Sequence, residues 1–215
     1  MSEKIPDSWP PAPEEPEEYP EVPIFPLGGV FLFPRQLMPL HVFEPRYRQM
    51  IEDILDGPGR LVIGTVTDEP RTNAKGDPDV LPVAGLGEIA RHEKTPDGRY
   101  FIWVFGLSRV RIEETESARL YRRVRFAPLQ EVEATRKEMD ELIGPLRAAI
   151  LSRASGQELP EGVPLEILAD LLLQKTAMPP GEMEGLFIEA SAAERARGAL
   201  AAHARYPPDA TPPEE

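Results

Sequence analysis

The stretch that decides the fold is residues 83–112, which read VAGLGEIARHEKTPDGRYFIWVFGLSRVRI. Two apolar, strand-like runs, 83–94 and 100–112, flank the four residues TPDG at 95–98. Proline presets φ for a turn, and the glycine accepts the positive φ that closes it. The pattern therefore predicts a β-hairpin. Because residues 100–105 are apolar on both faces, we expect the second strand to lie centrally in its sheet.

Further strand-like segments lie around this hairpin. Residues 22–27 are apolar but contain two prolines, which predicts an edge strand. An amphipathic helix is predicted from Pro45, where the missing N–H of proline costs nothing, to the glycines near residue 57. Three more strands are predicted at 37–43, 60–66 and 120–129, with a polar surface loop at 67–79.

After residue 130 the apolar residues recur at helical spacing instead of alternating. Helices are predicted at 139–150 with a kink at Pro145, from Pro164 onward, at 183–189, and from a Ser191–Glu194 capping box to about Arg205. Strands followed by helices indicate the α+β class. No internal repeat is found at a period of 20–50 residues.

The chain of 215 residues has a formal net charge of −13, and this charge is unevenly distributed along the sequence. Residues 1–20 hold six acids, one base and six prolines, and residues 207–215 hold three acids, four prolines and no base. Such segments bury too little apolar surface to offset the entropy of ordering. We expect disordered acidic tails at 1–20 and 207–215, a β-rich part at 21–130 and a helical part at 131–206. The acidic balance argues against bulk affinity for nucleic acid or anionic membranes.

The sequence offers no recognisable catalytic or metal-binding set. It has no cysteine, and its histidines, His41, His92 and His203, lie far apart. The segment GLGEIA at 85–90 fits a dinucleotide fingerprint, but a strand and not a helix follows it, so we interpret the glycines as a bulge or tight bend. No run of 18 apolar residues and no signal peptide is found, and a cytoplasmic, non-enzymatic protein without cofactors or metals is expected.

One surface feature suggests a binding site. Alternation along two neighbouring strands places several arginines and one tyrosine on shared faces. These candidate contact residues are Arg109, Arg111, Tyr121, Arg123 and Arg125. Arginine forks bind carboxylates and phosphates, which favours an acidic peptide or a phosphate-bearing ligand. The alternative, which we prefer, is cross-strand pairing with the glutamates at 113, 114 and 116, or a solvated sheet face.

The order of motifs resembles the Lon protease N-terminal domain. The resemblance is carried by VPIFPL at 22–27, VFLFP at 30–34, MPLHVFEPRY at 38–47, LVIGTV at 61–66, the PDG turn and VFGLSRVRI at 104–112. It extends more loosely to residue 206. It implies a PUA-like, partly closed β-barrel followed by a small α-helical bundle. The ATPase and Ser–Lys peptidase parts of that protease have no counterpart in these residues, so a stand-alone, non-catalytic protein is expected.

The resemblance also implies a function. We expect a protein- or peptide-recognition module, acting as an adaptor or substrate receptor in protein quality control. Its partners would be unfolded or peptide segments of other proteins, and a protease or chaperone. Phe31 and Phe33 are further candidate contacts, with packing of the barrel as the preferred alternative. Two more hypotheses are RNA binding, which the net charge opposes, and docking of the glutamates at 14–18 on the arginines.

Overall fold

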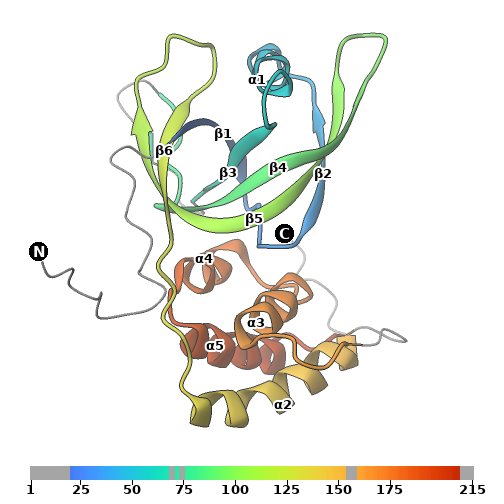
Figure 1. Ribbon diagram of the computed structural model, residues 1–215, viewed down its shortest axis with the longest axis vertical. Coiled ribbons are helices and arrows are strands. Elements are labelled where there is room, and N and C mark those ends of the chain that lie inside the picture. Colours follow the sequence, from blue (N-terminus) through green and yellow to red (C-terminus); the bar gives the residue numbers. More distant parts are fainter. Residues whose placement is uncertain (1–19, 68–70, 73–75, 154–158, 209–215) are drawn as a thin grey trace, which may run out of the picture.

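The computed structural model describes residues 20–67, 71–72, 76–153 and 159–208, so both expected tails lie almost wholly outside it (Figure 1). The strands are β1 (Glu21–Gly28), β2 (Leu37–Val42), β3 (Arg60–Val66), β4 (Val83–Lys94), β5 (Tyr100–Thr115) and β6 (Arg123–Pro128). The helices are α1 (Pro45–Leu55), α2 (Arg136–Arg153), α3 (Leu165–Gln174), α4 (Pro180–Ile188) and α5 (Ala192–Arg205).

Five of the strands close into a ring. The order β5-β4-β3-β1-β6 returns to β5, with β1 and β3 parallel and the other pairs antiparallel. One edge of β5 pairs with β4 along its length. Its other edge pairs with β2 over residues 100–105 and with β6 over residues 110–115. β2 is therefore an extra strand attached outside the ring (Figure 1).

Glycines let the loop between β1 and β2 pass close to the sheet at the base of this barrel. This close approach lies where the pairing partner of β5 changes from β2 to β6. A Cβ at Gly106 would lie 2.0 Å from the carbonyl oxygen of Phe33, and one at Gly85 would lie 2.3 Å from that of Leu32. Two main-chain hydrogen bonds hold this close approach, from the Arg35 N–H to Gly106 O (2.7 Å) and from the Gly106 N–H to Gln36 O (2.8 Å). The bulge predicted from the glycines of β4 is confirmed as a register shift between residues 86 and 87.

The prediction that residues 22–27 form an edge strand is wrong, because β1 lies between β3 and β6. The two prolines are nevertheless tolerated for a local reason. β6 pairs with residues 21–23 of β1, whereas β3 pairs with residues 24–28. Each half of β1 thus has one unpaired edge, where a residue without an N–H leaves no ladder bond unmade.

The helices stand on the base of the barrel. Their apolar core, built around Leu146, Leu168 and Phe187, includes Phe33 and Val83 from the barrel. This cluster spans the junction of the two parts, two further apolar clusters fill the barrel, and the predicted α+β class is confirmed. The helix starts at Pro45 and at the Ser191 cap are confirmed, with Ser191 Oγ accepting the Glu194 N–H at 3.3 Å. The last strand is shorter than predicted, since β6 begins only at Arg123.

Gly106→Ala tests the close approach of the Phe33 main chain to β5. The added Cβ meets main chain that two hydrogen bonds hold in place, so we expect the free energy of unfolding to fall by about 1–3 kcal/mol in denaturant titrations. Gly185→Ala is the matched control, because Gly185 lies inside α4 and an added Cβ has no heavy atom within 4 Å beyond its chain neighbours. That change should stabilise the protein by about 0.5–1 kcal/mol. Equal effects of the two substitutions would contradict the close approach at Gly106.

Candidate functional site

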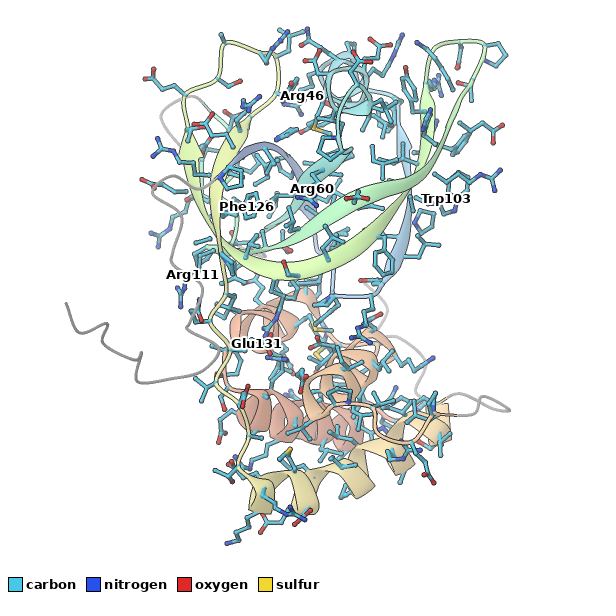
Figure 2. All side chains as sticks on the ribbon, viewed as in Figure 1. Arg46, Arg60, Trp103, Arg111, Phe126 and Glu131 are labelled. Atoms are coloured by element: carbon cyan, nitrogen blue, oxygen red, sulfur yellow. The ribbon has the colours of Figure 1, made fainter. Side chains whose placement is uncertain are left out.

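The structure does not gather the predicted arginines into one site. Arg109 points inward, and its guanidinium has no exposed surface. It donates to the carbonyl oxygens of Phe187 (2.6 Å) and Glu189 (2.8 Å) at the end of α4, and it pairs with Glu131. Glu131 lies at the level where the barrel meets the helices (Figure 2). Arg109 therefore fastens the barrel to the helical part.

A second buried arginine completes this junction. Arg195 of α5 donates to Asp170 Oδ1 (2.9 Å), to Glu189 O (2.9 Å) and to Glu131 Oε2 (3.2 Å). Burial raises the pKa of Asp170 to about 6, although Arg195 opposes the shift. Burial also acts to raise the pKa of Glu131, but hydrogen bonds and charge from both arginines outweigh it and hold that pKa below its usual value.

The other arginine-face residues take part in local pairs. The guanidinium groups of Arg123 and Arg125 lie 3.6 Å and 3.5 Å from the Glu21 carboxylate. The Tyr121 hydroxyl donates to Asp53 Oδ2 at 2.8 Å. Arg111 is exposed on the outer face of β5, on a different side of the barrel from Trp103 (Figure 2). The partners of the Arg123, Arg125 and Tyr121 side chains are Glu21 and Asp53, not the glutamates at 113, 114 and 116 named in the cross-strand alternative.

Phe31 and Phe33 lie where the barrel meets α4. Their rings contact the Phe187 ring edge-on, with centroids 5.3 Å and 5.1 Å away. Phe33 is 2% exposed, and Phe31 is partly buried. Both rings thus pack between the barrel and the helices.

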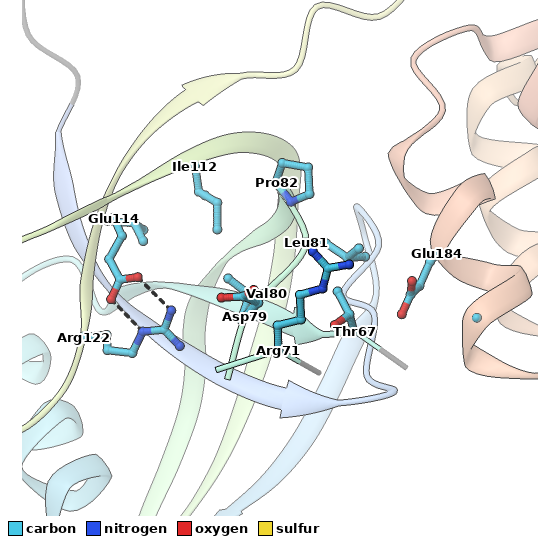
Figure 3. A pocket seen from close by; sticks show the side chains of 12 residues that line it. Thr67, Arg71, Asp79, Val80, Leu81, Pro82, Ile112, Glu114, Arg122 and Glu184 are labelled. Carbon is cyan, nitrogen blue, oxygen red and sulfur yellow. Dashed lines mark hydrogen bonds and ion pairs between the residues drawn. The ribbon is translucent and has the colours of Figure 1, made fainter. Parts of the chain in front are cut away.

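A cleft of about 750 Å³ opens between the barrel and α4 (Figure 3). Its floor is apolar, with Val80, Ile112 and Val124. Beside the floor, two parallel 2.8 Å hydrogen bonds join the guanidinium of Arg122 to the Glu114 carboxylate. The described lining contains no histidine, cysteine, serine or lysine, and its single hydroxyl side chain is that of Thr67.

The most prominent surface feature is an apolar face on the outside of β2 and β5. Cross-strand partners Leu37–Phe105, Pro39–Trp103 and His41–Phe101 lie side by side on it. The His41 ring stacks on Phe101 with centroids 4.6 Å apart and an interplanar angle of 15°. We call the following set the aromatic stripe: Leu37, Pro39, His41, Phe43, Phe101, Trp103, Phe105 and Leu107. Leu37 is 54% exposed, Phe43 57%, Phe101 42% and Phe105 40%.

The aromatic stripe has two different borders. On the β4 side, Glu88, Arg91 and Glu93 lie opposite its aromatic residues, and the Arg91 guanidinium sits 4.8 Å from the centre of the Trp103 ring. On the other side lies the outer edge of β2. Figure 2 shows Trp103 on the outer side of the barrel, away from the helices. An apolar surface of this kind, rimmed by charge, marks an interaction site.

Sequence reasoning did not select the aromatic stripe, although its signal was present. Residues 100–105 do form a central strand between β2 and β4, as predicted. The sequence showed that both faces of this strand are apolar, but not that Phe101 and Phe105 are exposed on one of them. Apolar residues on the second face of a strand predict either a covering layer or a binding surface, and the helices cover the base of the barrel instead.

The described residues define an α+β binding domain, a small β-barrel with a helical bundle on its base. No group of three or more His, Cys, Asp or Glu side chains among them is placed to hold a metal ion. None of the described helices is long and apolar enough to cross a membrane. Residues 21–195 match the family model of the ATP-dependent protease La (LON) substrate-binding domain. The chain belongs to this family.

Individual relatives agree with this assignment. The chain is 27% identical over 122 residues to a Lon protease of Desulfosudis oleivorans, covering 57% of this chain and 15% of that protein. It is 26% identical over 151 residues to the Escherichia coli K12 Lon protease, covering 70% and 19%. The chain thus spans less than a fifth of the length of these relatives.

Solved structures show the same fold. The N-terminal domain of the Mycobacterium avium complex Lon protease superposes with a TM-score of 0.65 at 18% identity, covering 86% of this chain and 98% of that one. A Lon N-terminal domain protein from Xanthomonas campestris gives a TM-score of 0.60 at 18% identity, with coverage of 85% and 98%.

Arg109→Met tests the junction. It leaves the carbonyl acceptors of α4 and the Glu131 carboxylate without their buried partner, so we expect a loss of about 3–5 kcal/mol in the free energy of unfolding. Arg111→Met, two residues along β5 and exposed, should change it by less than about 0.5 kcal/mol. Similar losses in both variants would mean that Arg109 is not the fastening residue.

Asp170 gives the junction a pH dependence of defined sign. Because its pKa rises on folding, the folded protein holds this proton more tightly than the unfolded chain. Its contribution is complete below about pH 4 and is lost as the pH rises through 6. Relative to Asp170→Asn, wild-type stability should therefore fall by up to about 3 kcal/mol between pH 4 and 7. Denaturant titrations across that range measure it, and parallel profiles would contradict the shift.

Proposed function

We propose that this chain is a non-catalytic recognition module that binds unfolded or peptide segments of other proteins through the aromatic stripe. The observation that carries the proposal is the exposure, by 40% or more, of three phenylalanine and leucine side chains on one strand pair and of Phe43 directly after β2. Folded proteins rarely expose so much contiguous apolar surface without a use for it. Unfolded segments offer matching apolar side chains, which folded proteins bury.

Membership of the substrate-binding family supports this role. A role as an adaptor or substrate receptor in protein quality control would follow if the bound segments are then passed to a protease or chaperone. We include that step in the proposal because the relatives named above are Lon proteases.

RNA binding is not favoured. Recognition of single strands combines stacking aromatics with cations that track the phosphates. The aromatic stripe has the aromatics, but Glu88 and Glu93 accompany Arg91 along its border, and the chain carries a net charge of −13. Protein segments with apolar side chains fit this surface better than a polyanion does.

The double variant Phe101→Ser/Phe105→Ser tests the proposed function. The probe is a reduced, carboxymethylated protein that stays unfolded in native buffer, with its folded parent as the competitor. We expect the affinity of the unfolded probe to fall at least tenfold, about 1.4 kcal/mol, in calorimetric titrations. The melting temperature should change little, because both side chains lie on the outer face.

Leu120→Ser is the matched control. Leu120 is 69% exposed and apolar, but it lies in the β5–β6 connection outside the stripe. Its affinity should remain that of the wild type. Unchanged binding by the double variant would contradict the proposed function, and equal losses in both proteins would indicate non-specific apolar adsorption.

A further inference from the structure

β2 has an unpaired outer edge. In the described part of the chain β2 pairs with β5 and with no other strand. It is an edge because the ring closes through β6 and leaves β2 outside. The row of N–H and C=O groups along such an edge is a template for another strand.

The register decides which groups lie on this edge. The Gly106 N–H donates to Gln36 O at 2.8 Å, which fixes the alternation of bonds between β2 and β5. In an antiparallel pair every second residue turns its main-chain groups away from the partner. Leu37, Pro39 and His41 are therefore the residues whose main-chain groups face outward. Pro39 fits this assignment, since a proline at this position costs no bond to β5.

The same three residues carry their side chains on the aromatic stripe. A strand added beside β2 would lie about 4.8 Å away and would place every second side chain on that face. Charged residues of β4 close the stripe on its other side, so the apolar surface continues only toward the free edge. The unpaired main chain of β2 and the apolar side chains of the stripe thus favour the same kind of ligand, an added strand with apolar side chains on one face.

We propose that the occupant is an extended, proline-free segment of another protein, with apolar residues at alternate positions, which binds as an added strand on β2. This inference rests on the proposed function and specifies the form of the bound segment. The main-chain bonds are independent of sequence, which suits a surface that accepts many proteins, and the alternate side chains supply selectivity.

Pro39 limits this pairing. The edge offers two N–H donors, from Leu37 and His41, and lacks the one between them. An added strand therefore forms an incomplete ladder, which keeps binding reversible. The same gap weakens pairing of two copies of this chain through their β2 edges, since both strands would lack a donor.

Backbone N-methylation tests the main-chain contacts. The probe is a nine-residue peptide that alternates valine or phenylalanine with threonine or lysine, in two forms methylated on the amides of one alternate set or the other. Only one set faces β2: the apolar positions if the pairing is antiparallel, and the polar positions if it is parallel. We expect one form to bind at least tenfold more weakly than the unmethylated peptide and the other within about twofold.

Hydrogen exchange gives a second readout on the folded chain. The Leu37 and His41 amides should exchange at least tenfold more slowly when the peptide is bound. In Pro39→Val, which restores the missing donor, the peptide should bind severalfold more tightly. Equal effects of the two methylated forms, with no protection at these amides, would overturn the added strand.

The outcomes separate this inference from the proposed function. If the unfolded protein binds through the stripe but the peptide shows no preference between methylated forms, recognition is by side chains alone and the added strand is wrong. If neither probe binds, the proposed function fails as well. A wild-type dimer that the peptide dissociates would assign the β2 edge to a second copy of the chain and would also overturn this inference.

Discussion

The structure depends on how one long strand divides its edge between two neighbours. β5 spans 16 residues, and β2 and β6 occupy successive parts of the same edge. At the change-over, Gly106 admits the main chain of Phe33. A side chain there would force the loop away from the barrel base and separate β2 from its register. The close approach therefore both allows the ring to close through β6 and leaves β2 outside it.

Three arginines of this acidic protein act on its interior and on its main chain. Arg109 and Arg195 satisfy carbonyl oxygens at the end of α4 and share Glu131 between them. Arg153 likewise donates to the carbonyl oxygens of Lys175 and His203, at the ends of α3 and α5. A guanidinium has five N–H donors, so one side chain can donate to several carbonyl oxygens that would otherwise lack a hydrogen-bond partner where elements meet. Two arginines close in the sequence can therefore differ in role: Arg109 joins the barrel to the helices, whereas Arg111 is exposed to solvent.

The sequence predicted what local physics decides. The TPDG turn, the helix start at Pro45, the Ser191 cap and the bulge near Gly87 depend on residues close in the chain. The placement of β1 between two strands was not predictable, because its prolines pair with residues that come 38 and 100 positions later. Which face of β5 meets solvent also depends on distant partners. Alternation shows that two faces differ, but not what covers each of them.

The ring geometry also explains how the exposed apolar surface of the aromatic stripe and a stable fold coexist in one strand pair. Val42, Ile102 and Val104 point into the barrel core, whereas the stripe residues between them point outward. A strand separates these two sets by its alternation, so substitutions on the outer face leave the core contacts in place. Binding energy can therefore change without loss of folding. The fold also limits the hazard of an exposed edge, because the proline that weakens pairing sits in the middle of the stripe and faces the unpaired edge of β2.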